Sequence, residues 1–169
     1  MRVFFAVWPD EPSLIRLEEA GSRLFAACGG KRTRRESIHL TLAFVGEIEE
    51  GELGKLKEAA CRVSASAFEI VLDKLGYWKH NKIAWAGCMQ VQRPLLELVS
   101  LLEAELKASN VALDARPYVP HVTLLRKAER PETIPDIPDI SWAVSEFTLT
   151  ASSPSGYQNL ASWPLKVDA

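Results

Sequence analysis

The chain has 169 residues, of which 47% are hydrophobic and 25% are charged, and its net charge at pH 7 is −2. This length and apolar content suit one globular domain or two small lobes with a shared core. With the repeated motif described below, we expect residues 1–169 to form a single bilobal domain. No apolar run approaches the roughly 20 residues of a membrane-spanning helix, and the first ten residues resemble a strand rather than a signal peptide. A nearly neutral chain attracts a polyanion only through a local basic patch.

The cysteines Cys28, Cys61 and Cys88 are widely spaced and contain no CxxC pair. An odd number without such a pair argues against a disulfide framework and against a thiolate zinc site. We therefore expect free thiols, a reducing compartment and a cytoplasmic location. The sequence offers no convincing set of metal ligands, so neither a metal nor another cofactor is predicted.

Hydrophobic periodicity and turn residues predict alternating strands and helices. The elements expected in chain order are strand 2–8, helix 11–28, strand 38–45, helix 49–65, strands 68–75 and 82–88, helix 93–109, and strands 118–126, 142–151 and 157–167. Pro12 suits the first turn of the first helix, and two glycines at 29–30 suit its end. The stretch 130–139 contains three prolines, so it is expected to be an irregular surface connection.

One four-residue pattern occurs twice, as HLTL at 39–42 and as HVTL at 121–124, so each half of the chain carries one copy. Successive side chains of a β-strand point to opposite faces, so the His and Thr of each copy share one face. The apolar residues of each copy then point into the core. Two such strands side by side would surround a ligand with two imidazoles and two hydroxyls.

The two halves also share an order, because each contains a helix followed by a motif strand with further strands around it. This order predicts an α+β protein with two antiparallel β-sheets related by a pseudo-twofold axis. We expect the helices on the outer faces, and the motif strands along an active-site cleft between the two lobes.

Two histidines and two threonines suit the hydrolysis of a cyclic phosphodiester. The attacking water must lose a proton and the departing ribose oxygen must gain one, and histidine can do either near neutral pH. In-line displacement places these two events on opposite sides of phosphorus, which matches histidines from opposite lobes. Threonine hydroxyls can donate hydrogen bonds to the non-bridging oxygens. These residues by themselves do not say which histidine is the acid.

The paired motifs and their flanks resemble the two-histidine phosphoesterase superfamily. They are most similar to the bacterial RNA 2′,3′-cyclic phosphodiesterases, originally called 2′-5′ RNA ligases. The resemblance covers nearly the whole chain and includes RVFFA at 2–6, IHLTLAFVG at 38–46, PHVTLLR at 120–126, EFTL at 146–149 and ASS at 151–153.

This resemblance implies an enzyme that hydrolyses RNA 2′,3′-cyclic phosphate ends to 2′-phosphomonoesters without a metal, with weak reverse 2′-5′ ligation. It implies that His39 is the proton donor to the 3′ oxygen and that His121 is the proton acceptor from water. Thr41 and Thr123 would hold the phosphate. The implied partners are RNA ends such as tRNA fragments, with no membrane, and the implied state is a monomer.

Two sets of basic residues have alternative interpretations. Arg126 matches an Arg that is common after the second motif in the family, and a guanidinium would suit a phosphate. Strict alternation from His121 instead places Arg126 on the core side, unless a bulge or the strand end turns it back. The cluster KRTRR at 31–35 either steers RNA phosphates toward the His39 strand or is a solvated loop.

Two other functions stay open on the sequence. The first is the same chemistry on a small nucleotide, such as a cyclic ADP-ribose phosphate or a 2′-5′ oligoadenylate. The second is an RNA-binding module without catalysis, against which the presence of both histidines and both threonines argues. A deep closed pocket would favour the small nucleotide, whereas an open cleft rimmed by residues 31–35 would favour RNA.

Overall fold

The computed structural model describes residues 1–167, and the last two positions of the predicted domain lie outside the described residues. The helices are α1 (Glu11–Cys28), α2 (Leu53–Cys61) and α3 (Arg93–Ala108), with short 3₁₀ turns η1 (Arg35–Ser37) and η2 (Glu50–Glu52). The strands are β1 (Arg2–Val7), β2 (Lys31–Arg32), β3 (Leu40–Glu47), β4 (Phe68–Leu72), β5 (Lys74–Trp78), β6 (Ile83–Gly87), β7 (His121–Arg126), β8 (Ile140–Val144), β9 (Glu146–Ser153) and β10 (Gly156–Pro164).

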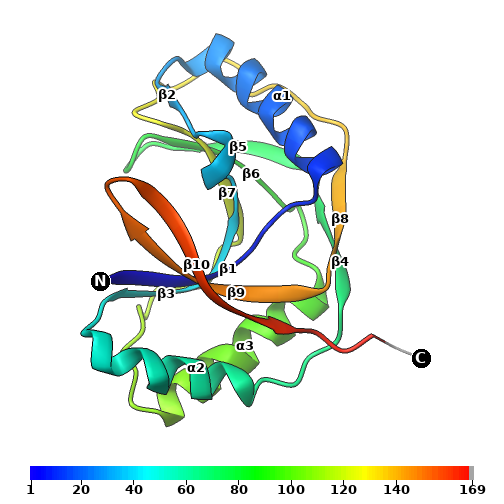
Figure 1. Ribbon diagram of the computed structural model, residues 1–169. Coiled ribbons are helices and arrows are strands. Elements are labelled where there is room, and N and C mark those ends of the chain that lie inside the picture. The colour runs from blue at the N-terminus through cyan, green and yellow to red at the C-terminus, as the bar shows by residue number, and fades with distance from the viewer. Residues whose placement is uncertain (168–169) are drawn as a thin grey trace.

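Two antiparallel sheets form the framework, which confirms the predicted α+β class. The larger sheet has the order β10-β9-β1-β3-β7-β6-β5, with β2 also paired to β7, and the smaller sheet consists of β4 and β8. At the centre of the larger sheet, β3 and β7 are joined by the single residue pair Leu40–Val122. This narrow junction divides the larger sheet into two lobes, one containing each motif strand (Figure 1).

The register at that junction reveals the internal symmetry. Leu40 and Val122 hold the same place in the two motif copies, immediately after the histidine. Antiparallel strands that pair through equivalent positions are related by a twofold axis at the point of pairing. The predicted pseudo-twofold axis therefore passes between these two residues.

The helices cover the lobes crosswise. Helix α1 packs on β7 and β6, although it precedes the first motif, whereas α3 packs on β3 and lies beside α2 (Figure 1). Helix α1 begins where the Asp10 carboxylate accepts a hydrogen bond from the Ser13 backbone N–H at 2.9 Å, and it ends at Gly29 with a φ of 61°. The two lobes are thus interlocked and do not correspond to the two halves of the sequence.

Several predicted boundaries are wrong because tertiary pairing ends the elements. The strand expected over 68–75 breaks at Asp73, since β4 pairs with β8 whereas β5 pairs with β6. For the same reason the strand expected over 142–151 is divided into β8 and β9 at Ser145. The helix expected over 49–65 ends at Cys61, and the chain beyond it forms backbone hydrogen bonds with Lys166.

Two more regions refine the predictions. The strand expected over 118–126 starts only at His121, after two prolines whose missing N–H groups cannot join a ladder. The cluster at 31–35, expected as a loop, contributes the short strand β2.

All three cysteines carry free thiols. No helix in the described part of the chain is long and apolar enough to cross a membrane.

Candidate active site

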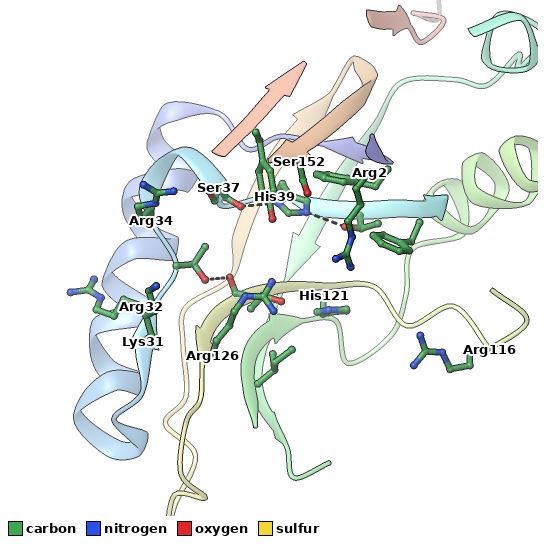
Figure 2. A pocket seen from close by; sticks show the side chains of 17 residues that line it. Arg2, Lys31, Arg32, Arg34, Ser37, His39, Arg116, His121, Arg126 and Ser152 are labelled. Carbon is green, nitrogen blue, oxygen red and sulfur yellow. Dashed lines mark hydrogen bonds between the residues drawn. The ribbon is translucent and has the colours of Figure 1, made fainter. Parts of the chain in front are cut away.

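A cleft with a volume of about 700 Å³ lies between the lobes (Figure 2). His39 and Thr41 line it from one lobe, and His121 and Thr123 line it from the other. The alternate residues of both motif strands are at most 2% exposed and belong to the core. The prediction that each His and Thr pair shares one face, above an apolar layer, is confirmed.

Both motif histidines are held by the backbone in the same way. The Nδ1 atom of His39 donates to the Ser37 carbonyl at 2.7 Å, and that of His121 donates to the Val119 carbonyl at 2.9 Å. A carbonyl oxygen only accepts, so Nδ1 carries the hydrogen in both rings. Nε2 of each neutral ring then carries no hydrogen and is the nitrogen that can accept a proton. In His39 this atom lies 3.0 Å from the Thr41 hydroxyl.

Aromatic rings enclose His39. Phe4 stacks on the imidazole with a centroid separation of 4.8 Å, and Trp8 and Tyr157 approach it at 5.2 Å and 5.3 Å. Burial among these rings lowers the pKa of His39 to about 4, against the opposing effect of the Ser37 carbonyl. In the free protein at neutral pH, this imidazole is therefore uncharged and able to accept a proton.

His121 has a more open environment. The ring of Trp78 meets it edge-on at 4.6 Å, and Trp78 itself packs against buried Trp85 at 5.1 Å, so both tryptophans serve packing. Burial also lowers the pKa of His121, and the positive charge of Arg126 lowers it further. The same charge lowers the pKa of His39, so Arg126 acts on both histidines.

A β-bulge after each motif threonine determines which later side chain of the strand points into the cleft. In β7 the ladder to β6 passes from Thr123 directly to Leu125, so Leu124 is an extra residue. In β3 the ladder to β1 likewise omits Leu42. Each bulge puts two successive residues into the core and shifts the later side chains by one position.

The bulge resolves the ambiguity at Arg126. Strict alternation would direct this side chain to the core, but after the bulge Arg126 is exposed and lines the cleft (Figure 2). Phe44 holds the equivalent place in the other motif strand and also lines the cleft, with the Arg2 guanidinium 4.9 Å from its ring centroid. Aligning the two motif copies through six residues would have revealed Phe44 as the counterpart of Arg126.

Two hydroxyl groups that the sequence reasoning missed support the bulges. Thr33 donates its hydroxyl hydrogen to the Thr123 carbonyl at 2.9 Å, and Tyr118 donates to the Thr41 carbonyl at 2.8 Å. Both donors lie in the segment that leads into a motif strand. No local pattern identifies them, because each one bonds to the motif of the other half.

The cleft is strongly basic even though the chain is nearly neutral. Among residues 1–167 its lining contains no carboxylate and six cationic side chains, namely Arg2, Lys31, Arg32, Arg34, Arg116 and Arg126. Such a lining attracts anions. Among residues 1–167, no group of three or more His, Cys, Asp or Glu side chains is placed to hold a metal ion.

Comparison with known proteins identifies the family. The model for LigT-like phosphoesterases matches residues 7–85 and 88–159. The RNA 2′,3′-cyclic phosphodiesterase of Escherichia coli K12 is 36% identical, and the alignment covers 97% of this chain and 96% of that protein. The structure of E. coli LigT complexed with 3′-AMP matches with a TM-score of 0.90 at 33% identity, covering 97% of each chain. TT0787 of Thermus thermophilus matches over the full length of both chains with a TM-score of 0.77 at 26% identity. The chain thus belongs to the LigT-like phosphoesterases of the two-histidine superfamily, as its motifs predicted.

Proposed function

We propose that this protein is an enzyme that hydrolyses the 2′,3′-cyclic phosphate at an RNA end to a 2′-phosphomonoester. The observation that carries the proposal is the pair of motif strands, which place two equivalently held histidines on one basic cleft. The relatives named RNA 2′,3′-cyclic phosphodiesterases support it. The open basic rim favours RNA over a small nucleotide.

In the proposed mechanism the two Nε2 atoms act on opposite sides of phosphorus. His121 takes a proton from water, the water oxygen bonds to phosphorus, and the bond from phosphorus to the 3′ oxygen breaks. His39 gives its proton to that oxygen, which leaves a 2′-phosphate. The hydroxyls of Thr41 and Thr123, with Arg126, donate hydrogen bonds to the non-bridging oxygens. Weak 2′-5′ ligation follows the same path with a ribose 5′-hydroxyl in place of water, so that its oxygen bonds to phosphorus, the bond to the 3′ oxygen breaks and a 2′-5′ phosphodiester forms.

The acid role of His39 needs a proton that the free imidazole holds poorly. Its pKa of about 4 arises mainly from burial, which disfavours the charged ring. A phosphate anion beside Nε2 favours the imidazolium and raises that pKa. We therefore infer that His39 becomes protonated when the substrate binds. The monomeric state, the cytoplasmic location and tRNA fragments as substrates stay predictions.

The direct test uses a short RNA with a 2′,3′-cyclic phosphate end and a 2′,3′-cyclic mononucleotide, both in EDTA. We expect a 2′-phosphate from each, at a rate that EDTA leaves unchanged, because every proposed step uses side chains alone. Product identity follows from chromatography against 2′- and 3′-phosphate standards. A 3′-phosphate would contradict the assigned bond cleavage. Activity lost in EDTA and restored by a divalent ion would contradict the metal-free mechanism, and no turnover would overturn the function.

The pH dependence should be bell-shaped, with the maximum of kcat/KM below neutral pH. The reaction needs one proton on the histidine pair, and kcat/KM reports the free enzyme, in which burial lowers the pKa of both rings. The profile of kcat reports the bound enzyme, so the phosphate anion should shift that bell to higher pH. Initial rates from about pH 4 to about pH 9 check both profiles. A kcat/KM maximum above neutral pH would contradict this account.

A further inference from the structure

We infer that Lys31 and Arg34 form a second phosphate subsite, which binds the RNA backbone 5′ of the cyclic phosphate. This inference rests on the proposed function and specifies its substrate class as polymeric RNA. The cyclic phosphate closes the 3′ end, so the chain continues only from the 5′ oxygen of the terminal ribose. Any further phosphate that reaches these cations therefore belongs to the 5′ side.

The backbone that carries the two cations is fixed beside the second motif. In the ladder of β2 and β7, Lys31 pairs with Arg126. The next residues stay attached to β7, because the backbone N–H of Thr33 donates to the Leu124 carbonyl at 2.9 Å. Arg35 closes the segment by bonding to two carboxylates of α1. A segment held at both ends presents its side chains at a constant distance from the catalytic groups.

The five residues of this segment divide into anchors and free cations. Arg35 forms ion pairs with Glu11 and Glu18, and Arg32 donates to the Glu18 backbone carbonyl at 3.1 Å. Lys31 and Arg34 are exposed, line the cleft and pair with no carboxylate among residues 1–167 (Figure 2). These two are available to a ligand.

The pairing of Lys31 with Arg126 indicates that an anion binds between these two side chains. Side chains directly opposite each other in an antiparallel ladder share one face, and like charges there destabilise the pair. Both side chains are exposed on the cleft side, and no carboxylate in the described part of the chain lines the cleft to relieve the repulsion. A bound phosphate would relieve it.

The number of cationic side chains in the cleft indicates that the substrate is a polymer with more than one phosphate. A cyclic phosphate carries one negative charge, and Arg126 with the two motif threonines suffices to hold it. On the opposite side of the cleft, Arg116 is already paired with Asp114. Arg2, which also lies away from Lys31 in Figure 2, has its guanidinium 4.9 Å from the ring centroid of Phe44. Among the described residues, more cations without a carboxylate partner thus lie beside Lys31 and Arg34, where Arg126 also lies, so we place the incoming strand there.

The test compares the double variant Lys31→Ala/Arg34→Ala with the wild type on two substrates. For an RNA pentanucleotide with a cyclic phosphate end, we expect kcat/KM to fall roughly tenfold at low salt, mainly through KM. The slope of log kcat/KM against log salt should become shallower by about 1.4, or about 0.7 for each lost contact. Turnover of the 2′,3′-cyclic mononucleotide should stay within about twofold of wild type, because that substrate has no second phosphate.

Matched variants distinguish the loss of a phosphate subsite from a general loss of positive charge and from misfolding. Lys57→Ala/Lys107→Ala removes two exposed cations on α2 and α3 that do not line the cleft, and it should leave both activities unchanged. The exchange Lys31→Arg/Arg34→Lys keeps the charge and should keep the preference for RNA. An equal loss on both substrates, or no loss on RNA, would overturn the inference.

A binding experiment keeps this test independent of the proposed reaction. Fluorescence anisotropy with a labelled pentanucleotide ending in a 2′-phosphate reports the subsite even if the wild type turns over neither substrate. Weaker binding by Lys31→Ala/Arg34→Ala, with unchanged binding by the control pair, would support the subsite. Equal binding by all three proteins would overturn it.

Discussion

Replacing either motif histidine by alanine should remove most of the activity, by roughly 10²–10⁴-fold in kcat. In the proposed mechanism His39 and His121 exchange protons in the same transition state, so the double variant should be little worse than either single one. The measurement is steady-state hydrolysis of the cyclic-phosphate RNA. Near-ultraviolet circular dichroism should confirm intact packing, which matters most at His39 because Phe4 stacks on its ring.

A substrate with sulfur in place of the 3′ bridging oxygen separates the two roles. A thiolate leaves with less need for protonation, since a thiol has a pKa of about 8.5. His39→Ala should therefore lose much less activity on the sulfur substrate than on the oxygen substrate, whereas His121→Ala should lose equally on both. The opposite pattern would exchange acid and base. Full activity of either alanine variant on the oxygen substrate would overturn the two-histidine mechanism.

Gly76→Ala should destabilise the second lobe and slow catalysis. A Cβ at Gly76 would lie 2.2 Å from a ring carbon of Trp85, which is only 7% exposed and has little space to move. Overpacking of this kind typically costs about 1–3 kcal/mol. Trp85 contacts Trp78, and Trp78 contacts the ring of His121, so the displacement should reach the active site. Urea unfolding and kcat, measured on the same preparation, check both effects.

Gly54→Ala provides the matched control. Gly54 lies in α2, and a Cβ at this position would have no neighbouring atom within 4 Å, so alanine meets open space there. Alanine is also the better helix former, by roughly 0.5–1 kcal/mol. This variant should therefore keep or raise the unfolding midpoint and leave kcat unchanged. A Gly76→Ala protein as stable as wild type would contradict the proposed contact with Trp85.

Features that depend on local physics could be predicted from the sequence. Helix α1 has the predicted bounds because Asp10 caps its start and Gly29 ends it. The core face of each motif strand was also predictable, since the strand repeat of two residues places His and Thr together above buried residues. The repetition of the motif then indicated a pseudo-twofold cleft and the family.

Features that depend on a partner distant in the sequence required the folded chain. A bulge is a property of two paired strands, so the orientation of Arg126 followed only from the register of β7 against β6. The break at Asp73 likewise arises because the flanking strands join different sheets. Alternation within one strand carries no information about either event.

The same distinction applies to the charges. The sequence shows a basic cluster, but only the packing of α1 against it shows that Glu11 and Glu18 neutralise Arg35, whereas Lys31 and Arg34 have no carboxylate partner among the residues that the structure describes. The low pKa of His39 is also tertiary, because it comes from burial among rings brought in by other strands. Residue types determine which chemistry is available, and long-range contacts determine which groups are charged, exposed and directed at the substrate.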